Sequence, residues 1–411
     1  MSLNPDIIIQ APSRINIINP LDAVEGDFWM PSVAINGFKN PLSVFLYIKE
    51  IKGKSRLKIY TMKKLNDQYS IEINKEEILS KSRNEVKSKL NGENKLIYAS
   101  IYKFYKMSSY FERIFLKSNI EIGLITTIPE KSGLGGSAAI IIAVIFGLAQ
   151  YFDLYNNFEK VEENEFPINK DIIAEMATKI EDEDLKITAG YGDRYVISRG
   201  GLSFCSYYGK LYHKELAKEP LAIYDKIDDV YELNNIPIIL CYSGVHHESG
   251  DIHNKLRKIY LQNNAFFLRS YKKLAEISWN SRFALMQHNW IKLGQYCKEN
   301  TIIINKIMKK AGFKHGIGLA NNILIDLIED HPEVYAAKLT GAGGGGSVFA
   351  LVNPNNIKSI LNYWREKLNE IITNKEAFNL KFPSYPIEIT NKLKHAQFFQ
   401  VKIDKNGVKK L

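Results

Sequence analysis

Acidic residues and glycines lie close together in residues 180–201 of this chain (IEDEDLKITAGYGDRYVISRGG). Asp193 follows a short glycine-bearing turn, and the acids Glu181, Asp182 and Glu183 stand upstream of it. Phosphoryl transfer depends mainly on charge neutralisation, alignment and acceptance of the hydroxyl proton. A carboxylate beside an acceptor hydroxyl and a second one on Mg²⁺ would meet those needs. A solvated helix end is the alternative interpretation of the acidic cluster.

A glycine-rich turn precedes an apolar helix at residues 129–139 (PEKSGLGGSAA). A strand ends there, and Gly133, Gly135 and Gly136 permit a tight turn whose backbone comes close to a ligand. Free N–H groups and the positive end of the helix dipole then converge on one place, which suits a phosphate. The alternative is a plain helix start with Ser137 as its capping residue.

Two other glycine motifs are alternatives for the same turn. A Walker-type loop is excluded, because it needs a lysine before its Ser or Thr and the residue here is Gly136. A dinucleotide fingerprint fits Gly133, Gly135 and Ala138, with Asp153 further along the chain. In that fingerprint the acid follows a second strand, whereas Asp153 ends the helix itself, so this interpretation is disfavoured.

Two further segments near the ends of the chain combine polar residues with glycines. Residues 11–27 (APSRINIINPLDAVEGD) read as a strand followed by a polar loop, and residues 338–350 (KLTGAGGGGSVFA) as a glycine turn followed by a strand. Each alone would fit an ordinary loop or hinge. A linker rarely enters a buried strand directly, however. The order of these two segments and of the glycine-rich turn along the chain is also informative.

In order and spacing the segments resemble the three motifs of the GHMP kinases, which include galactokinase, homoserine kinase, mevalonate kinase and phosphomevalonate kinase. The residues that match the second motif, P-x-x-x-G-L-G-S-S-A-A, are Pro129, Gly133, Leu134, Gly135, Ser137, Ala138 and Ala139. Gly136 replaces the first serine and drops one hydroxyl. The resemblance implies ATP as a substrate and Mg²⁺ as a cofactor, with Ser137 reaching the metal. It implies that the triphosphate lies against Gly133, Leu134, Gly135, Gly136, Ser137 and Ala138.

The outer segments resemble the first and third motifs of the family. Arg14 and Asp22 match the first motif by position, which implies an arginine near the reacting centre and an aspartate that holds sugar hydroxyls. Asn19 and Gly26 belong to the same predicted substrate-binding loop. The His and Glu of the galactokinase version are missing, which argues against galactose. The third motif implies that backbone packs against phosphates and substrate at Gly341, Gly343 and Gly344.

The acidic segment resembles the family's A-G-x-x-D stretch, which carries the proposed general base. The resemblance implies that Asp193 deprotonates the acceptor and that an upstream acid binds Mg²⁺. Glu181 is the predicted metal ligand, and Asp182 and Glu183 stay open as rivals because the register of the short acidic run is uncertain.

Residues 243–257 (SGVHHESGDIHNKLR) resemble a stretch of glucuronokinase, S-G-x-x-H-x-x-x-R, matched by Ser249, Gly250, His253 and Arg257. This implies an anomeric hydroxyl as the acceptor. It also implies substrate contacts from His253 and Arg257, where the arginine would meet a carboxylate or else lie on the helix surface. Heptose-phosphate kinases are the second choice. The histidines do not form H-E-x-x-H, so a zinc site is disfavoured.

The elements that must position these residues follow from the hydrophobic patterns. Strands are predicted at residues 6–11, 43–49, 56–62, 120–127, 200–208 and 236–242, because β-branched and aromatic residues recur there at strand-like spacing. Helices are predicted at residues 96–115, 137–152, 252–274, 279–297, 301–311 and 319–328. The helix at 137–152 is apolar on every side and is expected to be buried.

Composition places the chain among globular proteins. Its 411 residues are 45% hydrophobic and suggest two or three domains. The net charge of +10 favours small anionic partners over nucleic acid, because the lysines are scattered. Three widely spaced cysteines are expected to be buried thiols. The longest apolar run is too short to span a membrane, no secretory signal is visible, and a cytoplasmic location is predicted.

We therefore predict an α+β protein with the two-domain GHMP kinase fold. Residues 1–200 would form a ribosomal-protein-S5-like ATP-binding domain and residues 201–411 the C-terminal domain. The expected activity is transfer of the γ-phosphoryl group of ATP to a hydroxyl of a sugar or sugar acid, by a monomer or homodimer. A catalytically silent sugar and ATP sensor is the alternative from another class. A decarboxylase of the mevalonate branch is a third option.

Overall fold

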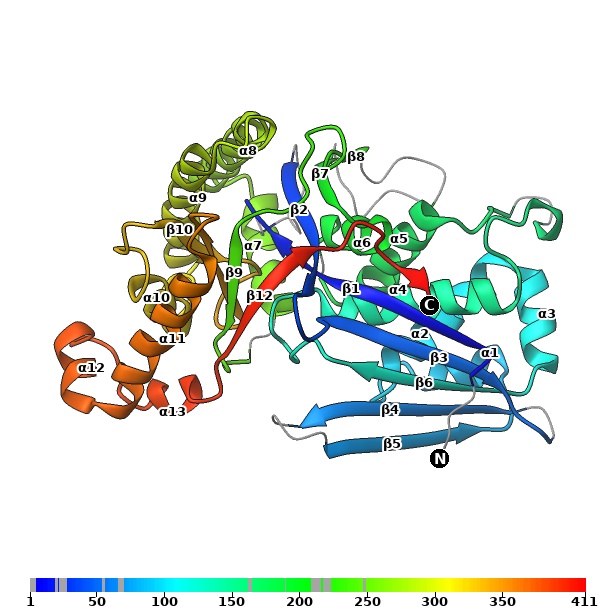
Figure 1. Ribbon diagram of the computed structural model, residues 1–411. Helices are drawn as coiled ribbons and strands as arrows, with labels where there is room; N and C mark the ends of the chain where they lie inside the picture. Colours follow the sequence, from blue (N-terminus) through cyan, green and yellow to red (C-terminus); the bar gives the residue numbers. More distant parts are fainter. Residues whose placement is uncertain are drawn as a thin grey trace.

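Strands from both ends of the chain meet in one extended sheet (Figure 1). The computed structural model describes residues 5–18, 21, 28–53, 56–65, 70–161, 165–188, 190–207, 216, 223–246 and 249–411. Its strands are β1 (Ile7–Asn16), β2 (Phe28–Gly37), β3 (Ser43–Glu50), β4 (Leu57–Leu65), β5 (Ser70–Ile78), β6 (Ile120–Thr126), β7 (Leu202–Tyr207), β8 (Ile223–Lys226), β9 (Ile238–Tyr242), β10 (Val334–Leu339), β11 (Ser347–Val352), β12 (Gln397–Ile403) and β13 (Lys409–Lys410).

Helices cover the sheet in both halves of the chain. They are α1 (Arg83–Ser88), α2 (Lys95–Met107), α3 (Ser109–Lys117), α4 (Gly136–Tyr151), α5 (Lys170–Lys179), α6 (Gly192–Arg199), α7 (Ser249–Leu261), α8 (Ala265–Met286), α9 (Trp290–Lys310), α10 (Leu319–Asp326), α11 (Ile357–Thr373), α12 (Lys375–Lys381) and α13 (Ile389–Leu393). Two short turns complete the described elements, the 3₁₀ turn η1 (Phe158–Lys160) and the π-helical turn η2 (Ile180–Asp184).

The strand order in the sheet is β10-β11-β9-β12-β2-β1-β3-β6-β4-β5. All pairs in this row are antiparallel except β4 with β6, which is parallel. β1 changes partners along its length, because residues 7–12 pair with β3 and residues 13–16 pair with β2. Side chains alternate across a strand, so Arg14 and Asn16 lie on the same face of β1.

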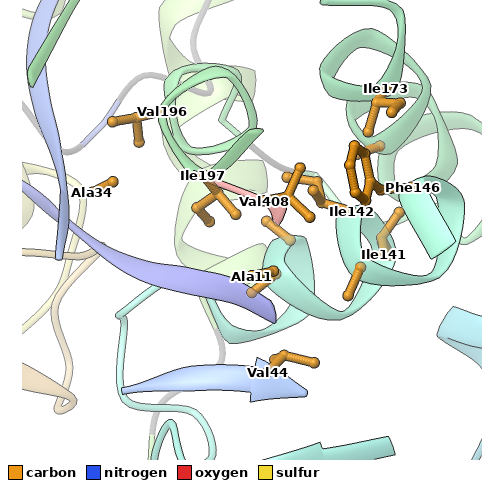
Figure 2. Close-up of a cluster of buried hydrophobic side chains, with 14 of the residues drawn as sticks. Ala11, Ala34, Val44, Ile141, Ile142, Phe146, Ile173, Val196, Ile197 and Val408 are labelled. Atoms are coloured by element: carbon orange, nitrogen blue, oxygen red, sulfur yellow. The ribbon is translucent and has the colours of Figure 1, made fainter. Parts of the chain in front are cut away.

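α4 lies at the centre of the first hydrophobic core (Figure 2). Its sequence is apolar on every side, and residues such as Ile141, Ile142 and Phe146 are buried against the sheet and its neighbouring helices. Gly147 faces Leu46 of β3 so closely that a Cβ there would lie 2.6 Å from the leucine Cδ2. A side chain at position 147 would therefore require the flexible Leu46 side chain to shift, and the glycine avoids this at the close approach of helix to sheet. The predicted buried helix is confirmed.

The C-terminal half builds a second core around β9, β10 and β11, with α8 to α11 packed beside them. The chain then returns to the first half, where β12 pairs with β2 and β13 pairs with β1. β7, which begins at Leu202, also pairs with β2. The division into residues 1–200 and 201–411 stays a prediction, and the sheet continues across it.

Several predicted helix boundaries were wrong. The helix predicted at residues 96–115 is two helices, because Ser108 adopts an extended conformation and its hydroxyl caps α3. The helices predicted at 252–274, 279–297 and 301–311 are α7, α8 and α9 instead, with breaks before Ala265 and Trp290. The side chains of Asn264 and Asn289 cap the new helices, and these local hydrogen bonds outweigh the continuous apolar pattern.

The three cysteines, Cys205, Cys241 and Cys297, are buried free thiols, as predicted. Burial raises the pKa of the Cys297 thiol to about 11, so the thiol is kept protonated and unreactive at neutral pH. In the part of the chain that the structure describes, no helix has the length and apolar character needed to cross a bilayer.

Candidate active site

One cleft of about 1590 Å³ collects the predicted site segments. Its walls include β1, the glycine turn before α4, the segment from η2 to α6, the start of α7 and the glycine turn after β10. Ser137 and Asp193 both line it, so the phosphate-binding turn and the acidic segment face the same space. The predicted contacts Asn19, Asp22 and Gly26 lie outside the described residues.

The turn before α4 has the backbone that its glycines permit. Gly133 and Gly135 adopt positive φ angles of 70° and 79°, which side chains rarely tolerate. A Cβ at Gly135 would lie 2.9 Å from Ile197 Cδ1 and 3.1 Å from Arg14 Cγ. Gly135 is the N-cap residue of α4 and makes no side-chain cap, which disagrees with the alternative interpretation of this turn, in which Ser137 caps the helix. Ser137 stands one residue inside the helix, exposed to the cleft.

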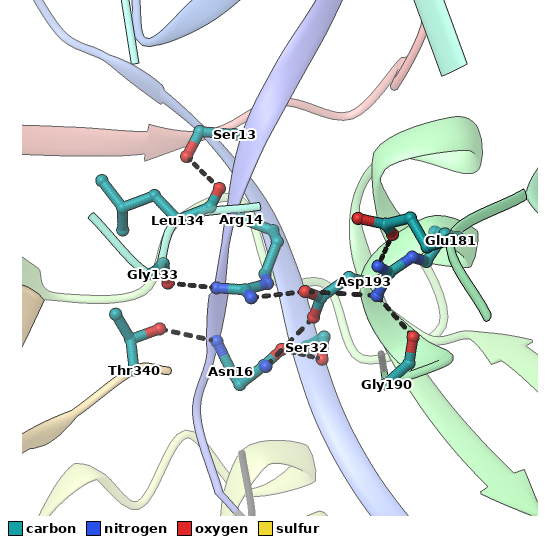
Figure 3. Close-up of polar contacts among 11 residues, drawn as sticks. Ser13, Arg14, Asn16, Ser32, Gly133, Leu134, Glu181, Gly190, Asp193 and Thr340 are labelled. Carbon is teal, nitrogen blue, oxygen red and sulfur yellow. Dashed lines mark hydrogen bonds and ion pairs between the residues drawn. The ribbon is translucent and has the colours of Figure 1, made fainter. Parts of the chain in front are cut away.

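β1 holds this turn in place through three hydrogen bonds (Figure 3). The Ser13 hydroxyl donates to the Leu134 carbonyl at 2.8 Å, and the Arg14 backbone N–H donates to the same carbonyl at 3.2 Å. The Arg14 guanidinium donates to the Gly133 carbonyl. Leu134 itself is fully buried and contributes no described lining to the cleft. The segment at residues 11–27 and the glycine turn before α4 are thus joined directly through β1.

The third segment, after β10, contacts both of these segments. The Asn16 backbone N–H donates to the Thr340 hydroxyl at 3.0 Å, and Gly341 packs so closely that a Cβ would lie 3.1 Å from Gly133 Cα. Gly341 lines the cleft. Gly343 and Gly344 are not among the described lining residues, because they pack on the backbone of Ile317, to whose carbonyl the Gly344 N–H donates at 2.7 Å. Their contact with a substrate stays a prediction.

Asp193 lines the cleft from the first turn of α6. Its carboxylate forms an ion pair with Arg14 and accepts a hydrogen bond from the Asn16 amide at 3.1 Å (Figure 3). The Ser32 hydroxyl donates to Asn16 Oδ1 at 2.6 Å and orients that amide. Asp193 is only 8% exposed, so this arrangement compensates a largely buried charge and directs it into the cleft.

Basic side chains form ion pairs with all four acids of η2. Each carboxylate has a basic partner, and two of them share Lys103: Glu181 pairs with Arg194, Asp182 with Arg257 at 3.2 Å, Glu183 with Lys103 at 3.1 Å and Lys179 at 3.2 Å, and Asp184 with Lys103 at 3.1 Å and Lys106 at 2.6 Å. Burial acts to raise the pKa of Glu183, but Lys103 and Lys179 outweigh it and hold that pKa below its usual value. Of the four acids, Glu181 lines the cleft. These acids lie in a π-helical turn, whose side-chain spacing differs from that of a regular α-helix.

Of the two predicted substrate contacts in the glucuronokinase-like segment, one lines the cleft and the other does not. His253 is 8% exposed and lines the cleft. Arg257 does not belong to the described lining and forms its ion pair with Asp182 instead. In the described residues no group of three His, Cys, Asp or Glu side chains could hold a metal ion. His247 and Glu248 lie outside those residues.

Sequence reasoning missed several residues that the fold brings to this site. Asn16 and Thr340 link the segments, and Thr188, His246 and Asn254 add polar groups to the cleft lining. Asn16 had a usable signal, because it stands two residues after Arg14 on a strand and must share its face. The other four lie within segments that the sequence already singled out, but contacts between distant parts of the chain decide that these particular side chains reach the site.

The family comparisons match both halves of the chain. The model described as "GHMP kinases N terminal domain" matches residues 96–201, and the model described as "GHMP kinases C terminal" matches residues 284–370. "Probable glucuronokinase 2" of Arabidopsis thaliana is 27% identical over 58% of this chain and 59% of its own length. "D-glycero-alpha-D-manno-heptose 7-phosphate kinase" of Campylobacter jejuni is 26% identical over 69% of this chain and 75% of its own. The chain thus spans about three fifths of the length of the glucuronokinases that it matches.

Solved structures share the whole fold. Lactococcus lactis galactokinase, complexed with galactose, aligns over 98% of this chain and 95% of its own with a TM-score of 0.66 and 15% identity. Methanococcus jannaschii mevalonate kinase aligns over 98% and 99% with a TM-score of 0.62 and 19% identity. At these identities the likeness establishes the fold alone.

Proposed function

Because the chain belongs to the GHMP kinase family, we propose that it transfers the γ-phosphoryl group of ATP to a hydroxyl of a sugar or sugar acid. The observation that carries this proposal is that Ser137 and Asp193 line one cleft. The glycine turn of Ser137 offers backbone donors for phosphates, and Asp193 offers a carboxylate for an acceptor hydroxyl. A phosphate donor and an acceptor bound there would share the same space.

Each site residue has a role in this proposal that its contacts support. Asp193 orients the acceptor hydroxyl and takes its proton, and Asn16 keeps the carboxylate in place. Arg14 lies between Gly133 of the turn and Asp193, so its positive charge is placed to offset charge that develops on the transferred group. Backbone N–H groups at the start of α4 bind the phosphates, supported by the helix dipole. Little other chemistry is needed for phosphoryl transfer.

The donors around the turn fit a Mg²⁺ ion. Ser137 supplies a hydroxyl and Glu181 a carboxylate in the same cleft, and Mg²⁺ usually takes one or two such protein ligands together with phosphate oxygens and water. Glu181 and Ser137 are the residues that would hold the ion. When bound, Mg²⁺ would neutralise negative charge on the phosphates. Arg194 compensates the Glu181 carboxylate in the structure described here.

Glu181→Gln should weaken the use of Mg²⁺ by about tenfold or more, because the neutral amide is a poor ligand for a hard cation. The measurement is the Mg²⁺ dependence of ADP release, together with the Mg²⁺ dependence of ATP binding by calorimetry. Glu183→Gln is the matched control, since Glu183 pairs with Lys103 and Lys179 away from the cleft. Equal Mg²⁺ dependence in both variants would remove Glu181 from the metal site.

The lining of the cleft suits a hydroxylated acceptor with an acidic group. Thr188, His253 and Asn254 offer hydrogen bonds to hydroxyls, and Lys186 and His246 offer donors for an anion. D-Glucuronate, phosphorylated at its anomeric hydroxyl, fits this description, and the glucuronokinase relatives support it. A heptose phosphate is the second candidate, supported by the Campylobacter relative.

The function is tested by incubating the protein with Mg²⁺-ATP and a panel of sugars, sugar acids and sugar phosphates. ADP release identifies the acceptor, and phosphorus NMR of the product identifies the phosphorylated oxygen. A kinase gives sugar-dependent ADP and no CO₂, whereas a decarboxylase of the mevalonate branch releases CO₂ from a phosphorylated hydroxy acid. A regulator on the same fold binds ATP and sugar without turnover, which would contradict the proposal.

A further inference from the structure

One face of α7 is marked by three residues at helical spacing. Gly250, His253 and Arg257 are separated by three and four positions, so they lie above one another on the same side of the helix. The sequence interpretation connected this segment with substrate binding. In the structure these three residues make different contacts, and the contacts indicate a role for this face other than direct substrate binding.

Both ends of this face contact the segment that carries the acidic run. At one end Gly250 approaches Ile187, and a Cβ on the glycine would lie 3.3 Å from the isoleucine Cγ2. At the other end Arg257 Nη1 lies 3.2 Å from Asp182 Oδ1. His253 stands between these contacts and lines the cleft. The helix is therefore fastened to residues 182–187 on either side of its cleft-facing histidine.

The ion pair is well shielded from water. The Arg257 side chain is 13% exposed and the Asp182 side chain 9% exposed. Asp182 is the neighbour of Glu181, whose carboxylate pairs with Arg194 in the cleft. The Arg257–Asp182 pair thus connects the helix of the C-terminal half to the turn that carries the predicted metal ligand.

We propose that the Arg257–Asp182 ion pair is a positioning pair, which holds α7 against residues 182–187 so that His253 stays at the wall of the acceptor site. Arg257 then acts through His253 and does not touch the substrate. This inference rests on the proposed kinase function for its kinetic consequence. Its structural consequence, the fastening of α7, does not depend on that function.

Removal of either Arg257 or Asp182 from the ion pair should increase local opening of α7 to the same extent. Asp182→Asn and Arg257→Gln each remove an ion pair between two poorly hydrated side chains. We expect hydrogen exchange of residues 249–261 to become about tenfold faster in both variants. Arg257→Lys should show an intermediate effect, because lysine keeps the charge and loses the planar geometry. The charge reversal Asp182→Arg with Arg257→Asp should bring exchange back towards the original rate.

The kinetic arm uses D-glucuronate as the acceptor. In both single variants we expect its KM to rise about tenfold while the KM for ATP stays within about twofold, because the glycine turn is untouched. Asp225→Asn is the matched control: it breaks an ion pair with Arg282 at 3.1 Å, which joins β8 to α8 outside the lining of the cleft. This control should change neither the exchange of α7 nor either KM.

Two results would overturn the proposal. Unchanged exchange at residues 249–261 in Asp182→Asn and Arg257→Gln would show that the pair does not fasten α7. A raised KM for D-glucuronate in Arg257→Gln alone, with Asp182→Asn unaffected, would make Arg257 a direct substrate contact. If D-glucuronate gives no turnover with the unmodified protein, the proposed substrate fails, and the exchange measurement still decides the positioning pair.

Discussion

Asp193→Asn should lose about two to four orders of magnitude in turnover while ATP binding is nearly unchanged. The amide keeps the shape of the side chain but cannot accept the acceptor proton, and it cancels the charge that pairs with Arg14. The glycine turn that would hold the phosphates keeps its own hydrogen bonds to β1. The measurement combines steady-state ADP release with ATP titration by calorimetry.

The control for this variant is Asp171→Asn. Asp171 of α5 pairs with Arg199 of α6, the same helix that carries Asp193, and it lies outside the described lining of the cleft. Loss of that pair should leave turnover within about twofold, because both side chains are partly exposed and neither belongs to the described lining of the cleft. Unchanged turnover in Asp193→Asn would remove Asp193 from the mechanism.

Arg14→Met should reduce both turnover and stability. The guanidinium donates to the Gly133 carbonyl and pairs with the buried Asp193 carboxylate, so methionine replaces the apolar stem of the arginine and leaves the carboxylate without its main counter-ion. Breaking a buried pair from one side costs about 3–5 kcal/mol of folding free energy. Loss of a charge placed to stabilise the transferring group costs about 10²–10³ in turnover. Urea unfolding and ADP release measure the two effects.

Two further variants separate charge from packing at Arg14. Arg14→Met combined with Asp193→Asn should be more stable than Arg14→Met alone, because no uncompensated charge remains. Arg14→Lys should recover part of the stability, since one ammonium group supplies the charge but cannot reproduce the fork that spans two acceptors. Simple additivity of the two losses in the double variant would contradict the assigned ion pair.

Much of the fold was predictable from local patterns. The apolar run of α4 is confirmed as a buried helix, and the strand before it, β6, begins where the sequence predicts it. The two-domain GHMP kinase fold of mixed helix and sheet is confirmed by the family matches and the solved structures. Helix breaks were less predictable. A single side chain such as Asn264 or Asn289 decides them, and its effect on the hydrophobic pattern is small.

The sequence identified the individual segments, and their resemblance to the GHMP kinase motifs implied that they come together. Glycines at positions such as 133 and 135, directly before an apolar helix, indicate a tight turn. The structure agrees, because both have positive φ angles that exclude most side chains. Asp193 after its glycine-bearing turn was equally visible as a chemical group. These inferences succeed because the required information lies within a few consecutive residues.

Only the tertiary structure decided which charged groups face the cleft and which hold the fold. Within the acidic run, Glu181 lines the cleft while Asp182 pairs with Arg257, a residue 75 positions away. The π-helical turn breaks the regular spacing by which side-chain directions are extrapolated along a helix. The partner of a charge depends on which distant segment packs beside it, and the arrangement of neighbouring residues in the sequence carries no record of that contact.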